Sequence, residues 1–107
     1  MTEAKKAKIL NIEKLAAYQD DAVVSSQIMR AEKGNITLFA FDEGQELSEH
    51  STPFDALVQI LDGKAEVSIS GKSFMMKAGE SIILPADKPH ALKATKKFKM
   101  LLTMIKA

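Results

Sequence analysis

The sequence predicts an all-β protein, either a sandwich or a closed barrel of antiparallel strands. From Val23 onward, short runs rich in β-branched and aromatic residues alternate with turn signals that recur roughly every eight to twelve residues. This spacing favours a sandwich or barrel over a parallel α/β sheet. No internal repeat, low-complexity segment or linker divides the chain, so we expect a single domain over residues 1–107.

The expected elements follow from these runs and turns. The strands are predicted, in chain order, at Val23–Met29, Asn35–Phe41, Ala56–Leu61, Glu66–Ser70, Ser73–Lys77, Ser81–Leu84, His90–Ala94 and Phe98–Ile105. Asp62-Gly63 is a strong hairpin signal between the third and fourth strands, and Gly71-Lys72 turns the chain again. Residues 1–8, which are charged and small, predict a loose terminus. Asn11 can cap a short helix through Tyr18, which needs packing to be stable.

Composition limits the classes of function. The chain has 15 Lys and Arg against 14 Asp and Glu, a net charge of +1, so electrostatics gives no reason to expect nucleic-acid or membrane binding. It has no cysteine, which excludes disulfides, thiolate metal sites and a cysteine nucleophile. No apolar run approaches the roughly 20 residues that span a bilayer, and the terminus does not resemble a secretory signal. We therefore expect a soluble, cytoplasmic protein.

Two segments carry glycine, proline and histidine at fixed offsets. The first is GQELSEHSTPFDALVQILDG, residues 44–63, and the second is GESIILPADKPHALKA, residues 79–94. They resemble the two cupin motifs, G-x5-H-x-H-x3-E-x6-G and G-x5-P-x-G-x2-H-x3-N. The six matching anchors are Gly44, His50, Gly63, Gly79, Pro85 and His90. The chain looks most like the small single-domain "cupin 2 conserved barrel" proteins, which implies a double-stranded β-helix, or jelly-roll barrel.

The departures from these motifs concern the metal site that the resemblance implies. In metal-binding cupins the four ligand positions correspond to His50, Thr52, Ala56 and His90 of this sequence, so only the two histidines retain a good ligand. Two imidazoles alone hold a first-row metal such as Zn, Ni, Mn or Fe weakly, because protein sites generally use three or four ligands. Asp87 and Ala94 also replace the second motif's glycine and asparagine.

Strand alternation predicts which side chains surround the histidines. His50 and Thr52 share a face, and Ala56 and Val58 lie on the corresponding face of the next strand. We expect a ligand pocket formed by His50, Thr52, Ala56, Val58, Phe41 and His90. By the same alternation, Glu46 and Ser48 lie on the His50 face, which makes Glu46 a candidate additional ligand. No catalytic residue can be assigned from the sequence.

Each of these features also has a purely structural interpretation. The histidine pair can bind a metal or an anionic ligand, or can simply hydrogen-bond to backbone and water. Asp87, in the run from Pro85 to Pro89, is better explained as a turn residue. The lysines at 93, 96, 97 and 99 are typical of a solvated face. Alternation of Met100, Leu102 and Met104 favours core packing or an oligomer interface, although methionine sulfur can bind Cu(I).

Three hypotheses for function follow. The first is a barrel that binds a small organic ligand, for example a carboxylate, or a weakly held metal in its mouth. The second is a metal-dependent dioxygenase or isomerase that uses His50 and His90. The third is a barrel that mainly associates; the resemblance implies a homodimer, to which residues 8–10 and 99–105 could contribute strands or faces.

Overall fold

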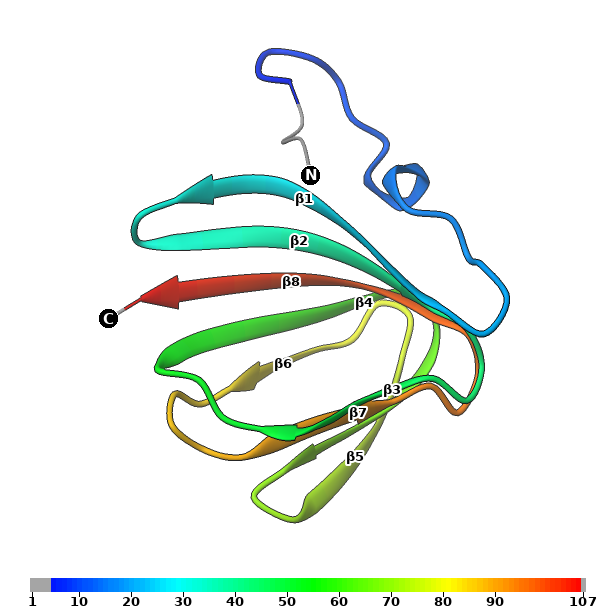
Figure 1. Ribbon diagram of the computed structural model, residues 1–107, viewed down its shortest axis with the longest axis vertical. Coiled ribbons are helices and arrows are strands. Elements are labelled where there is room, and N and C mark those ends of the chain that lie inside the picture. The colour runs from blue at the N-terminus through cyan, green and yellow to red at the C-terminus, as the bar shows by residue number, and fades with distance from the viewer. Residues whose placement is uncertain (1–4, 107) are drawn as a thin grey trace.

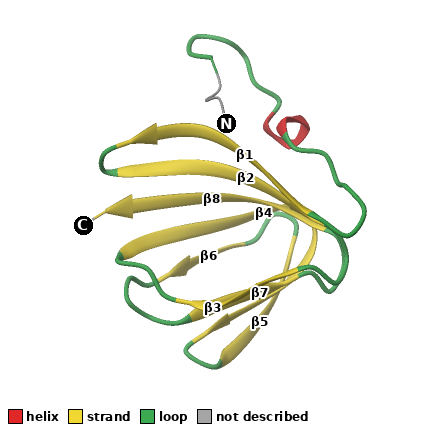
Figure 2. Ribbon diagram, viewed as in Figure 1, coloured by secondary structure: helices red, strands yellow, loops and turns green. Residues whose placement is uncertain are grey.

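The computed structural model describes residues 5–106, and almost all of its regular structure is antiparallel β-sheet (Figures 1 and 2). The elements in chain order are η1 (Ile12–Leu15), β1 (Val23–Ala31), β2 (Gly34–Phe41), β3 (Glu46–His50), β4 (Phe54–Ile69), β5 (Lys72–Lys77), β6 (Ser81–Leu84), β7 (His90–Lys93) and β8 (Phe98–Lys106). The predicted all-β jelly-roll class is thus confirmed. The part of the chain that the structure describes contains no helix long and apolar enough to cross a membrane.

The strands form two layers that share β4. The first half of β4 lies between β8 and β6, and β2 and then β1 extend this layer beyond β8. The second half of β4 lies between β5 and β7, and β3 completes this second layer. The two layers converge at one end, where the β2–β3 connection, the middle of β4 and the β7–β8 turn meet (Figure 1). We call this the closed end, formed by residues 42–45, 62–64 and 94–97, and the opposite end the mouth.

The predicted hairpin at Asp62-Gly63 is wrong, because the two halves of β4 do not pair with each other: the first half pairs with β8 and β6, and the second half with β5 and β7. Instead, the register against β8 shifts between Ile60 and Asp62, and Gly63 takes the left-handed backbone conformation with φ +78°. A Cβ at Gly63 would clash with the Lys97 carbonyl oxygen. Glycine is therefore required here to bend one strand from the first layer into the second. The hairpin turn between β4 and β5 lies at Ser70 and Gly71, both at positive φ, close to the predicted Gly71-Lys72 turn.

The predicted helix from Asn11 to Tyr18 is only a single 3-10 turn, Ile12–Leu15, and Asn11 makes no side-chain cap bond. Ile12, Leu15 and Tyr18 pack against a small cluster on the outer side of the first layer; its buried members are Ala16, Ile28, Leu38 and Ala40. The Tyr18 hydroxyl donates a hydrogen bond to Asp62 Oδ2 at 2.6 Å. Tertiary contacts, and not helix propensity, thus hold this segment in place.

The main core lies between the layers. Phe41 and Phe98 are fully buried, and their rings stack with centroids 4.5 Å apart. Val58, Val67 and Met100 are fully buried in the same cluster. Stacked aromatic rings contribute about 0.5–1.5 kcal/mol beyond their buried area, so this cluster stabilises the closed half of the barrel.

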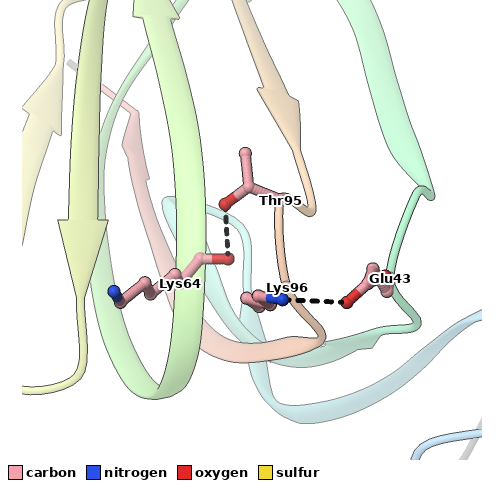
Figure 3. A network of polar contacts seen from close by, with 4 residues as sticks. All are labelled: Glu43, Lys64, Thr95 and Lys96. Atoms are coloured by element: carbon pink, nitrogen blue, oxygen red, sulfur yellow. Dashed lines mark hydrogen bonds and ion pairs between the residues drawn. The ribbon is translucent and has the colours of Figure 1, made fainter.

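Polar contacts at the closed end join segments that are distant in sequence (Figure 3). Thr95 Oγ1 donates a hydrogen bond to the Lys64 carbonyl oxygen at 3.5 Å, and Lys96 Nζ lies 3.8 Å from Glu43 Oε1. The Ala94 amide donates to the Gln45 carbonyl at 2.8 Å, and the Gly44 amide donates to the Ala94 carbonyl at 2.8 Å. Backbone bonds therefore fix Ala94, at the family's asparagine position, without a side-chain amide.

Candidate functional site

A cavity of about 270 Å³ lies between the two layers toward the mouth. It is lined by Phe39, Leu47, His50, Thr52, Ala56, Leu84, His90, Leu92, Met100, Leu102 and Met104. The only polar side chains among these are the two histidines and the threonine. None of the lining residues in the described part of the chain carries a carboxylate, an ammonium or a guanidinium group. The cavity thus combines an apolar wall with a small polar group, which is typical of small-molecule sites.

A bulge in β3 decides which side chains reach the cavity. Leu47 pairs with Leu92 and His50 pairs with His90. The chain therefore advances three positions along β3 where it advances two along β7, which leaves one extra residue in β3. The extra residue lets both Leu47 and His50 line the cavity. Glu46, Ser48 and Glu49 line a different groove, on the outer side of the second layer. The expectation that Glu46 shares the His50 face is therefore wrong, because simple alternation ignores the bulge.

The two imidazoles lie side by side at the mouth, with ring centroids 4.5 Å apart and planes at 67°. Nδ1 of His50 is 2.8 Å from the Ser48 carbonyl oxygen, and Nδ1 of His90 is 3.2 Å from the Lys88 carbonyl oxygen. A carbonyl oxygen only accepts hydrogen bonds, so Nδ1 carries the proton in both neutral rings. Each Nε2 consequently keeps a free lone pair on the side of the ring away from its own backbone.

The two histidines differ in exposure. His50 is exposed, whereas His90 is only 6% exposed. Burial lowers the pKa of His90, and the neighbouring His50 lowers it further, although the bond to the Lys88 carbonyl opposes both effects. The environment of His90 thus favours the neutral ring.

Hydrogen bonds from the turn between β6 and β7 shape the mouth beside the histidines. The Asp87 amide donates a hydrogen bond to the Thr52 carbonyl oxygen at 2.7 Å, and the Ala86 amide donates to Asp55 Oδ1 at 2.8 Å. Asp87 has φ +64° and is exposed. Its position requires a left-handed conformation, which the family motif supplies with glycine and which aspartate tolerates. Asp87 therefore serves as the turn residue that the sequence favoured.

Four of the six predicted pocket residues, His50, Thr52, Ala56 and His90, line the cavity. The two others do not: Val58 and Phe41 are fully buried in the core. Phe39 shares its strand face with Phe41 but lies nearer to the mouth, and it lines the cavity instead. Sequence reasoning assigned Met100, Leu102 and Met104 only to core or interface, although their alternation along β8 was the signal that one strand face bounds the cavity.

Comparison with known proteins agrees with this arrangement. The family model described as "Cupin domain" matches residues 37–106, which include both motifs, the bulged strand and both histidines. The chain belongs to the cupin family. The prediction of a cupin, made from the sequence, is therefore confirmed. It rested on Gly44, His50, Gly63, Gly79, Pro85 and His90.

Solved structures show how closely this cupin resembles others. It is 35% identical to a conserved Streptococcus pyogenes protein of unknown function, with a TM-score of 0.91 over 100% of this chain and 96% of that one. It is 40% identical to a cupin 2 conserved barrel domain protein from Leptotrichia buccalis, with a TM-score of 0.88 over 91% of this chain and 47% of that one. A cupin superfamily protein from Desulfitobacterium hafniense has the same fold, with a TM-score of 0.91 at 24% identity over 99% of this chain and 97% of that one.

A curated relative is similar over a shorter region. It is described as polyketide synthase CurC from Streptomyces cyaneus, and it is 30% identical over 61 residues. The match covers 56% of this chain and 40% of the relative, so it spans well under half of that protein.

Cupins commonly bind metals, so the donor set of this cupin is the relevant test. Residues 5–106 contain no group of three or more histidine, cysteine, aspartate or glutamate side chains placed to hold a metal ion. Thr52 Oγ1 lies 3.4 Å from both the amide nitrogen and the carbonyl oxygen of Phe54, and Ala56 has no donor atom. The residues present therefore do not fit a divalent metal centre of three or four protein ligands.

Proposed function

We propose that this cupin binds a small, largely apolar organic molecule in the cavity, and that binding does not require a metal. The single observation that carries the proposal is the composition of the wall, where eight of the eleven lining side chains are apolar and two of the family's four ligand positions hold Thr52 and Ala56. Apolar surface buried at such a site contributes roughly 25 cal/mol per Å². Thr52 and Ala56 thus replace two metal ligands and leave a cavity whose wall suits the apolar part of an organic ligand.

The size of the cavity limits the ligand. An apolar cavity of roughly 150 Å³ accommodates benzene, and drug-sized molecules occupy sites of about 300–1,000 Å³. The cavity here measures about 270 Å³. It is therefore suited to a ligand with one or two rings, or to a branched chain of similar size.

The test uses 2-methylnaphthalene as a probe, with its fluorescence recorded in the presence of EDTA. We expect saturable one-to-one binding to the wild-type protein. Ala56→Phe, which fills the cavity from β4, should abolish binding. Met75→Phe is the matched control, because Met75 is 60% exposed on β5 outside the cavity. Circular dichroism verifies that both variants fold. Absence of saturable binding to the folded wild-type protein would overturn the proposal.

A metal-dependent enzyme is the second candidate, and one observation favours it. Metal-bound histidines usually donate their other ring N–H to a carbonyl or carboxylate, and both histidines here have that arrangement. Metal analysis of protein purified without chelator, beside the double variant His50→Ala, His90→Ala, tests this candidate. A stoichiometric metal present only in the wild-type protein would favour the enzyme. If the wild-type protein contains no metal and does not bind added Zn, Ni, Mn or Fe, the metal-dependent enzyme is eliminated.

We also propose that the chain forms a homodimer in the cytoplasm. Ile9, in the segment 8–10, is fully exposed, which is consistent with a role for this segment in association. β1 lies at the edge of the first layer and carries one formal charge, at Arg30. Exposed edge strands are commonly protected by several charges, so the weak protection here favours pairing with a second copy of the chain. β8 pairs with β2 and β4 on its two sides, so it could contribute only a face. Sedimentation velocity at micromolar concentration should show a dimer, and a monomer alone would overturn this proposal.

A further inference from the structure

The hydrogen-bonding pattern around the two histidines restricts the polar group of the ligand. With Nδ1 of each ring facing a carbonyl oxygen at 2.8 and 3.2 Å, both neutral imidazoles offer only Nε2, and Nε2 can only accept a hydrogen bond. A ligand group that only accepts would leave the Nε2 lone pair of the buried His90 unsatisfied beside the apolar wall. Such an unsatisfied buried acceptor costs about 1–3 kcal/mol. The polar end of the ligand must therefore donate.

The charge of the cavity restricts that group further. A carboxylate needs a cation or several donors nearby, but the lining residues of the described chain include no lysine or arginine. An ammonium group would need a carboxylate partner, and Glu46 and Glu49 lie in the outer groove instead. A group that donates a hydrogen bond without carrying a charge satisfies both conditions, and a hydroxyl is the simplest one.

We propose that the cavity selects a neutral, hydroxyl-bearing molecule, a phenol or an alcohol with an apolar body, whose O–H donates to Nε2 of His90 or His50. His90 is buried beside the apolar wall and His50 lies at the rim, so the pair can accept from one hydroxyl deep in the cavity and from a second one nearer to solvent. This inference rests on the proposed function, and it replaces the carboxylate that the sequence suggested.

Binding of three probes with the same two-ring body tests the selection at pH 7.5 in the presence of EDTA. The probes are 2-naphthol, 2-naphthoate and 2-methylnaphthalene, which differ only in the substituent. We expect 2-naphthol to bind about tenfold more tightly than 2-naphthoate, the size of effect that one hydrogen bond and one unpaired charge can produce. It should also bind more tightly than 2-methylnaphthalene.

Variants assign this preference to the imidazoles. His90→Leu and His50→Leu should each reduce the preference for 2-naphthol over 2-methylnaphthalene, while binding of the hydrocarbon persists. His50 is exposed, so its variant remains informative if His90→Leu does not fold. Glu46→Gln is the control, because Glu46 lies in the outer groove and should leave the preference unchanged.

Nitrogen-15 NMR of the two histidines gives a readout that needs no ligand. We expect protonated Nδ1 and unprotonated Nε2 in both rings at pH 7.5; a proton on Nε2 of both rings would overturn the inference.

The three binding probes distinguish failure of the hydroxyl selection from failure of the proposed function. If 2-methylnaphthalene binds and 2-naphthol gains nothing, or if 2-naphthoate binds most tightly, the hydroxyl selection is wrong while the proposed function stands. If none of the three binds, the proposed function itself fails.

Discussion

The closed end and the mouth of the barrel are built from the same strands but are held together differently. At the closed end, the backbone of Gly63 lies against the Lys97 carbonyl, and Phe41 stacks on Phe98 in a fully buried core. At the mouth, loop hydrogen bonds and two imidazoles surround a cavity. Cavity walls lack packing partners on one side, so they contribute less to stability than a filled core does.

This difference predicts that stability and ligand binding depend on different ends of the barrel. Substitutions at the closed end should mainly change the free energy of unfolding. Substitutions at the mouth should change what the cavity holds and cost less stability, because the side chains there border an open space on one side. The expected outcomes below test this division, beginning with the largest effect.

Truncating one phenylalanine at each end compares the two regions directly. Phe98→Ala should lower the free energy of unfolding by about 3–5 kcal/mol, since it removes a fully buried ring and leaves a void. Phe39→Ala should cost about 1–3 kcal/mol, because Phe39 is only partly buried and already borders the cavity. Urea unfolding measures both. Equal losses would contradict the division between the ends.

Gly63 and Gly79 both have positive φ, but only Gly63 is crowded by a neighbouring carbonyl. Alanine substitutions at the two positions therefore distinguish the cost of a steric clash from the cost of the backbone conformation. Gly63→Ala should destabilise the protein by more than about 3 kcal/mol, because backbone strain adds to a clash with the Lys97 carbonyl. Gly79→Ala, at φ +92° with open space around its Cβ, should cost only about 1–2 kcal/mol. Thermal and urea unfolding of the two variants test the difference. A Gly63→Ala variant as stable as Gly79→Ala would show that the bend in β4 relaxes easily.

The pH dependence of stability should report the environment of His90. Its pKa is lower in the folded protein than in the unfolded chain, so the unfolded chain binds more protons as the pH falls below the ordinary histidine pKa of about 6.5. This group's contribution is therefore fully present above that pH and is lost as the pH falls toward the lower folded-state pKa. Unfolding measured between pH 8 and pH 5 should show the decline, and His90→Gln should remove part of it. An identical pH profile in the variant would contradict the assignment.

The smallest effect should come from the exposed ion pair at the closed end. Lys96 Nζ and Glu43 Oε1 are 3.8 Å apart, and both side chains are more than half exposed. Solvent screens such a pair, so Lys96→Gln should change the free energy of unfolding by less than about 0.5 kcal/mol. A larger loss, measured at low and high salt, would show that the contacts drawn in Figure 3 act as a network.

The family motifs predicted the fold well because their glycines and histidines mark fixed backbone positions. Gly63 and Gly79 occupy left-handed conformations, and His50 and His90 come together from different strands. The Asp62-Gly63 signal was misinterpreted because a local turn preference was outweighed by strand pairing on both sides of the bend.

Prediction of the site was partial for a physical reason. Alternation along a strand assumes regular pairing, and the β3 bulge breaks that assumption between Leu47 and His50. It also cannot distinguish how deep a side chain lies, so Phe41 was assigned to the pocket instead of Phe39. The hydrogen bonds that set the imidazole protons come from the Ser48 and Lys88 carbonyls, and backbone groups leave no mark in the residue types.

The shared strand β4 has a consequence for how the chain assembles. One strand, β4 (Phe54–Ile69), belongs to both layers. Neither layer can therefore unfold without disturbing the strand that pairs with β8 in the first layer and with β7 in the second. Unfolding should therefore be a single concerted transition, and amide protons in both halves of β4 should exchange only through global opening. The same linkage delays assembly, since distant segments must meet before either layer is complete. A barrel with a cavity at its mouth should thus still be slow to form and slow to come apart.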